Sequence, residues 1–123
     1  MNNEFMKRAI QLSINSVNCG TGPFGAVIVK DNQIISEGFN TVTSSKDPTA
    51  HAEIVAIRIA CKNLSNFSLE SCDLYTTCEP CPMCLSAIYW ARISKIYYAN
   101  TRSDAQKIDF SDAMIYEELN KTI

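Results

Sequence analysis

The chain has 123 residues, a formal net charge of −2, and a composition that is 46% hydrophobic and 20% charged. These values are typical of a single globular domain, which we place at residues 1–123, and they exclude a disordered or fibrous chain. The basic residues form no run longer than Lys7-Arg8, which weighs against a nucleic-acid partner because such binding depends on clustered cationic groups.

The first part of the chain predicts a helix and a β-hairpin. Apolar residues recur at helical spacing between Glu4 and Val17 and predict an amphipathic helix, which residues 19–23 break. Residues 24–30 and 33–39 are rich in apolar and β-branched side chains and predict two strands joined by a turn at Asp31-Asn32. The polar segment 40–48 is expected to be a loop. The apolar residues of the helix are Phe5, Met6, Ala9, Ile10, Ile14 and Val17.

The second part alternates helices and strands. Residues 50–62 contain no helix breaker and predict a helix that Thr49 or Asp47 can cap. Residues 73–77 predict a short strand, residues 82–91 a helix with proline in its first turn, and residues 93–99 another strand. Residues 109–119 carry a weaker helical pattern. Helices alternating with strands after an initial hairpin predict a layered α/β fold.

Six cysteines occur in the chain, and three of them fall within one seven-residue stretch. The N-terminus lacks the basic segment and apolar run of a signal peptide, and no stretch approaches membrane-spanning length. We therefore expect a cytoplasmic protein without membrane contacts, in which clustered cysteines serve a metal site or catalysis. The clustered residues are Cys78, Cys81 and Cys84, and those expected to be core thiols are Cys19, Cys61 and Cys72.

A candidate metal site follows from two short motifs, His51-Ala52-Glu53 and Cys81-x-x-Cys84. Each motif lies at the start of a predicted helix, and a single strand between the helices can bring their N-termini together. Zinc accepts imidazole nitrogen and thiolate sulfur, and a site with three protein ligands leaves a fourth position for water. Zinc lowers the pKa of bound water to about 7, and Glu53 is placed to collect its proton and return it to a substrate.

Each motif also has a structural interpretation. A single histidine is more often structural than catalytic, and an isolated C-x-x-C pair more often closes a loop or serves redox chemistry. Cys78 extends the pair to C-x-x-C-x-x-C, but an iron-sulfur cluster with the bacterial spacing needs a fourth cysteine where Ile88 stands. We therefore expect Cys78 to be a packed residue beside the metal site.

The combination of H-x-E with P-C-x-x-C is the signature of zinc-dependent nucleobase deaminases. With these motifs the chain resembles the cytidine deaminase-like superfamily and, within it, the bacterial guanine deaminases. The resemblance covers nearly the whole chain and implies a three-layer α-β-α sandwich with a central mixed sheet, one Zn²⁺ per chain and a homodimer. The matching segments are GPFGAVIV (22–29), DPTAHAE (47–53), TCEPCPMC (77–84), AIYWAR (87–92) and FSDAMIYE (110–117).

The same resemblance implies a free nucleobase as substrate and assigns residues to it. Asn40 would hydrogen-bond the purine, Phe24 would help to sandwich it, and Ala52 and Trp90 would lie beside it. Asp112 would supply a second catalytic carboxylate near the amino group. The implied reaction converts guanine and water to xanthine and ammonia. Structural alternatives are a turn at Asn40, core packing of Phe24 and Trp90, and a helix cap at Asp112.

Three other functions share parts of this pattern. A tRNA adenosine deaminase and a cytosine deaminase use the same metal chemistry, so the substrate pocket alone would separate them from a guanine deaminase. A non-catalytic module stabilised by zinc needs the ligands but not Glu53. The chain ends at Ile123, whereas the guanine deaminases that it resembles continue through a C-terminal segment that covers the active site, and we expect this segment to be lacking.

Overall fold

The computed structural model describes residues 3–101, 103 and 119, and the structural statements below refer to these residues. The predicted order of helices and strands is confirmed, with one additional short helix. The helix predicted over 109–119 lies almost wholly outside the described residues. In chain order the elements are α1 (Asn3–Asn18), β1 (Gly25–Lys30), β2 (Gln33–Phe39), α2 (Val42–Ser45), α3 (Ala52–Leu64), β3 (Cys72–Cys78), α4 (Pro82–Ala91) and β4 (Lys95–Asn100).

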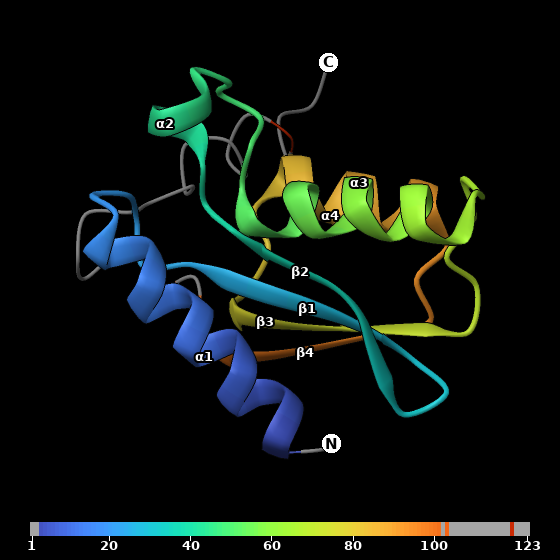
Figure 1. Ribbon diagram of the computed structural model, residues 1–123. Helices are drawn as coiled ribbons and strands as arrows, with labels where there is room; N and C mark the ends of the chain where they lie inside the picture. Colours follow the sequence, from blue (N-terminus) through green and yellow to red (C-terminus); the bar gives the residue numbers. More distant parts are fainter. Residues whose placement is uncertain (1–2, 102, 104–118, 120–123) are drawn as a thin grey trace.

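The four strands form one mixed sheet in the order β2-β1-β3-β4. Strand β1 is antiparallel to both β2 and β3, whereas β3 and β4 run parallel and are connected through α4. Figure 1 shows α1 on one face of the sheet and α3 and α4 side by side on the other. This arrangement confirms the predicted α-β-α sandwich with a central mixed sheet.

Strand β1 is the centre of two hydrophobic cores because its side chains alternate between the two faces of the sheet. Ala26 and Ile28 pack with residues of α3 and α4 in one core. Val27 and Val29 pack with residues of α1 in the other. A strand buried on both faces reads as a continuous apolar run, and this explains the sequence Ala26-Val27-Ile28-Val29.

The stripe of buried residues that helix α1 turns toward the sheet is narrower than the sequence pattern predicts. Its buried residues are Met6, Ala9, Leu12 and Ser16, whereas Ile10, Ile14 and Val17 are 41%, 49% and 51% exposed. The reason lies in the sheet. A Cβ atom at Gly25 would lie 2.2 Å from the Ala9 carbonyl oxygen, so the backbone of α1 approaches β1 at Ala9 and turns its neighbouring face to solvent.

Two local expectations are wrong. The predicted loop 40–48 contains α2, whose entry is set by the Val42 N–H donating to Asn40 Oδ1 at 2.9 Å. Cys19, predicted to be a core thiol, is exposed, whereas Cys72 is buried as predicted. Within the described part of the chain, none of the helices combines the length and the apolar character needed to cross a bilayer.

Candidate metal centre

The site is built where α3 and α4 begin. His51 is the N-cap of α3 with φ −67° and ψ 159°, and Cys81 is the N-cap of α4 with φ −69° and ψ 169°. Both residues are therefore extended and immediately precede their helices. Cys84 lies within the first turn of α4, so it projects from the same helix end as Cys81.

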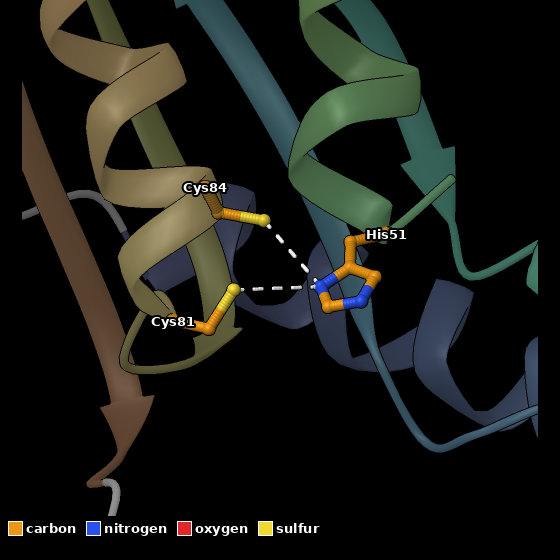
Figure 2. A group of neighbouring side chains, drawn as sticks. All are labelled: His51, Cys81 and Cys84. Carbon is orange, nitrogen blue, oxygen red and sulfur yellow. Dashed lines mark hydrogen bonds between the residues drawn. The ribbon is translucent and has the colours of Figure 1, made fainter. Parts of the chain in front are cut away.

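Three side chains converge at this point, as Figure 2 shows. His51 Nδ1 lies 3.7 Å from Cys81 Sγ and 3.5 Å from Cys84 Sγ, and all three ligand atoms lie within 4.8 Å of one another. A nitrogen and a sulfur bound tetrahedrally to one zinc ion, at the usual bond lengths, are about 3.6 Å apart. The observed distances therefore fit a zinc ion without rearrangement of the chain.

The burial of the ligands leaves one side of the centre accessible. Cys84 is buried, whereas His51 and Cys81 are partly exposed. A zinc ion held by three protein ligands has room for a fourth, and in catalytic sites a water or substrate takes that position. The exposure of His51 and Cys81 is consistent with such an open site.

Charges at the centre are coupled through the two thiols. A hydrogen bond from Cys84 and a weaker one from His51 lower the pKa of Cys81 to about 4. The same hydrogen bond raises the pKa of Cys84, which keeps its proton. The contact with Cys81 raises the pKa of His51. Because zinc binds thiolates and neutral imidazole, loading of the metal displaces these protons.

Glu53 lies in the first turn of α3, beside the candidate ligand Cys84. It is only 6% exposed, and a hydrogen bond between its carboxyl group and the Cys84 thiol contributes to the pKa shifts of both groups. Burial is the largest cause of the raised pKa of Glu53. A buried carboxyl group in contact with a candidate metal ligand can hold and release a proton there.

Two residues predicted to bind substrate, Phe24 and Asn40, lie at the same end of the sheet. The Asn40 N–H donates to the Phe24 carbonyl oxygen at 3.4 Å, because β1 begins where β2 ends. The next residue, Thr41, donates its N–H to the carbonyl of Ala50, which directly precedes His51. Asn40 Oδ1 accepts from the Val42 N–H, the local contact expected of the structural alternative, a turn residue.

The family model for the cytidine and deoxycytidylate deaminase zinc-binding region matches residues 1–100. The chain belongs to this deaminase family. The deaminase is 58% identical to guanine deaminase from Bacillus subtilis (strain 168), over 98% of this chain and 79% of that protein. It is 45% identical to a tRNA-specific adenosine deaminase from Aquifex aeolicus (strain VF5), over 77% of this chain and 63% of that protein.

Solved structures give the same relationships. The X-ray structure of the Bacillus subtilis guanine deaminase superposes with a TM-score of 0.95, covering 99% of this deaminase and 79% of that chain. A structure of guanine deaminase from Nitrosomonas europaea superposes with a TM-score of 0.83 at 28% identity, covering 88% of this deaminase and 63% of that chain.

Other predicted site residues of the deaminase lie elsewhere. Trp90 is 77% exposed near the C-terminal end of α4, about 13 Å along the helix axis from Cys81. Asp112 lies outside the described residues. Cys78 is not part of the ligand group, and its Sγ instead donates to the Thr101 carbonyl at 3.8 Å.

The predicted capping of α3 is wrong, because the N-cap residue is His51 and it makes no side-chain capping bond. Asp47 and Thr49 instead hydrogen-bond each other and Arg58, a residue that the sequence analysis did not single out. The pattern Asp-Pro-Thr is a signal for this local turn, since an aspartate side chain often accepts from the backbone two residues later.

Proposed function

We propose that this deaminase converts guanine and water to xanthine and ammonia. Its identity to the Bacillus subtilis guanine deaminase carries the proposal, because 58% identity over almost the whole chain exceeds the 45% found with the tRNA-specific relative. The converged ligand group beside a buried glutamate supports hydrolytic deamination as the chemistry.

In this proposal His51, Cys81 and Cys84 hold one zinc ion per chain. When bound, zinc lowers the pKa of a coordinated water, so that a nucleophile is available at neutral pH. Glu53 takes one proton from the attacking water and delivers it to a ring nitrogen of the purine. It then carries the second proton, from the hydroxyl group newly bonded to the purine carbon, to the amino group, which departs as ammonia while the C=O bond forms. The net reaction consumes one water and releases one ammonia for each guanine.

The same proposal assigns the substrate contacts. The purine would lie near Phe24, which precedes β1, Asn40, which follows β2, and Ala52, which begins α3 directly after the ligand His51. Asn40 uses Oδ1 within its own turn, so a contact with the base would come from its amide nitrogen. Asp112 would act on the amino group. Donors and acceptors set against the purine edge select guanine, because a wrong base leaves them unpaired.

We also propose a cytoplasmic homodimer of single-domain chains. The exposed aromatic residues Tyr89 and Trp90, at 70% and 77% exposure, support the dimer, because large apolar side chains gathered on one surface favour protein contacts. Trp90 would reach a substrate only across such an interface. Sedimentation of the purified protein tests the dimer, and a monomer at micromolar concentration would contradict it.

The experiment that tests the substrate is ammonia release by purified protein with guanine, adenine, cytosine, cytidine and a tRNA in parallel. We expect strong release with guanine alone. Release with tRNA that falls steeply as salt is added would instead favour an RNA substrate. A zinc-loaded protein that releases ammonia from none of these compounds would favour the non-catalytic zinc-stabilised module.

A further inference from the structure

The loop that leads to His51 is tied to the second turn of α3 by one arginine. Arg58 donates from Nη1 to Asp47 Oδ2 at 3.1 Å and from Nη2 to Thr49 Oγ1 at 3.1 Å. Asp47 Oδ1 accepts from the Thr49 N–H at 2.9 Å and from the Thr49 hydroxyl at 2.7 Å. We call Arg58, Asp47 and Thr49 the Arg58 clamp. It closes the chain segment between residues 47 and 58 into a ring.

Two backbone hydrogen bonds connect the Arg58 clamp to Ala50 and to the candidate metal ligand His51. The Thr49 carbonyl accepts from the His51 N–H at 2.8 Å, and the Asp47 carbonyl accepts from the Ala50 N–H at 3.1 Å. His51 itself is extended and precedes the helix, so the path of this backbone determines where its imidazole lies. A shift of the loop would move His51 Nδ1 relative to the thiols on α4.

Arg58 can span this distance because of helix geometry. It lies seven residues after His51, which is two turns of helix, and long side chains on a helix lean toward its N-terminus. The guanidinium group offers two parallel donors and therefore holds Asp47 and Thr49 at the same time. Lysine carries the same charge but lacks this planar pair of donors.

We propose that Arg58 is a positioning residue for the metal centre, which acts through Asp47 and Thr49 on the backbone of His51. Arg58 and Asp47 have side-chain exposures of 57% and 35%, and ion pairs of this kind contribute little to folding stability. The clamp therefore affects zinc binding more than folding. The inference rests on the zinc centre of the proposed function and is independent of the substrate.

The test is an equilibrium competition for zinc between the zinc-loaded protein and a coloured chelator. We expect Arg58→Met to bind zinc roughly two- to fivefold more weakly than wild type, because an exposed ion pair contributes only weakly to the positioning of His51. Arg58→Lys is expected to restore part of the loss. Asp47→Asn keeps an acceptor for Thr49 but loses the charge that faces Arg58, so its affinity is expected to be intermediate.

The matched control is Lys62→Met, which removes an exposed cation from the same helix and is expected to bind zinc like wild type. Circular dichroism of each zinc-loaded sample shows whether the variant is folded. If Arg58→Met is unfolded, the zinc affinity of Asp47→Asn decides the test. Equal zinc affinity of wild type and the folded clamp variants would overturn the inference. If the wild-type protein binds no zinc, both the inference and the proposed metal centre are wrong. If it binds zinc but does not deaminate guanine, only the proposed substrate is contradicted.

Discussion

Glu53 is a charged residue type in a position where charge is costly. Its side chain is 6% exposed, and burial raises its pKa. An ionised carboxylate in such a place is stable only when it is paired or when a cation lies close by. The residue is therefore poorly suited to a purely structural role, and its place beside Cys84 favours a role in proton transfer.

The first prediction concerns this residue. Glu53→Gln keeps the size and hydrogen-bonding capacity of the side chain but removes the proton acceptor, so we expect kcat to fall by roughly 10²- to 10⁴-fold. Zinc content should stay at one ion per chain. Ammonia release and atomic absorption measure the two quantities. Glu70→Gln, in the exposed loop before β3, serves as control, and a Glu53→Gln enzyme as active as this control would contradict the assignment.

At the scale of elements, β2 determines the position of α3. A Cβ atom at Gly38 would lie 2.5 Å from the Ala52 carbonyl oxygen and 2.7 Å from the Ala56 backbone nitrogen. The Ser36 hydroxyl, two residues earlier on the same face of the strand, donates to the Ala56 carbonyl at 2.8 Å. The first turns of α3, which carry His51 and Glu53, therefore rest directly on the backbone of β2.

A second prediction follows from this close approach. Gly38→Ala places a methyl group against the helix backbone, which cannot move independently, so we expect a loss of roughly 1–3 kcal/mol in the free energy of unfolding. Denaturant unfolding of the zinc-loaded protein measures it. Gln33→Ala, at an exposed position of the same strand, should differ from wild type by less than about 0.5 kcal/mol. An unchanged unfolding midpoint for Gly38→Ala would show that α3 can shift.

Helix α1 is held to the other face of β2 by an ion pair. Arg8 contacts both carboxylate oxygens of Glu37, with Nη2 3.0 Å from Oε1. The hydrogen bond from Arg8 lowers the pKa of Glu37 below its ordinary value of 4.5. Both side chains are more than one-third exposed, so solvent screening limits the contribution to less than about 1 kcal/mol.

The third prediction is the pH dependence of this pair. Because the pKa of Glu37 is lower in the folded protein, the contribution is fully present above about pH 4.5 and is lost as pH falls through the folded pKa. We expect Arg8→Met to be less stable than wild type at pH 7 and to converge with it at acid pH. Urea unfolding of Arg8→Met, Glu37→Gln and the double variant yields the coupling free energy. A coupling that persists when Glu37 is protonated would contradict the assignment.

At the scale of the whole molecule, the metal centre joins segments that are thirty residues apart. His51 belongs to the start of α3, and Cys81 and Cys84 belong to the start of α4, on the other side of β3 in the sequence. A zinc ion bound between them would link the two helices on one face of the sheet. Ligands that bind only the folded state stabilise it in proportion to the logarithm of their concentration.

The fourth prediction is that removal of zinc lowers the melting temperature. At a free zinc concentration a hundred times the dissociation constant, binding contributes about 2.7 kcal/mol, which corresponds to a Tm shift on the order of 10 °C for a domain of this size. Calorimetry with and without a chelator measures the shift. Cys81→Ser, which lacks one ligand, should respond to the chelator much less. Equal shifts in wild type and Cys81→Ser would place the zinc effect outside this centre.

The convergence of His51, Cys81 and Cys84 and the types of the helices and strands could be predicted from the sequence because they depend on local spacing. Cys81 and Cys84 are one helical turn apart, so they share a helix end wherever the helix lies. His51 and Glu53 are two residues apart, and a ligand and a proton acceptor so close in sequence stay close in the fold. The apolar segment 24–30 likewise predicts a buried strand, and this is confirmed by the burial of residues 26–29.

The features that could not be predicted from the sequence depend on packing between distant segments. Helical spacing groups Ile10 with Ala9, but only the contact of Ala9 with Gly25 determines which of them is buried. Asp47 and Thr49 have the chemistry of helix caps, yet Arg58, reaching back along α3, engages both of them. The exposed position of Trp90, away from the ligands, likewise follows from how α4 lies on the sheet. Local spacing fixes which groups can act together, whereas the choice among equivalent faces depends on close contacts that only the folded chain makes.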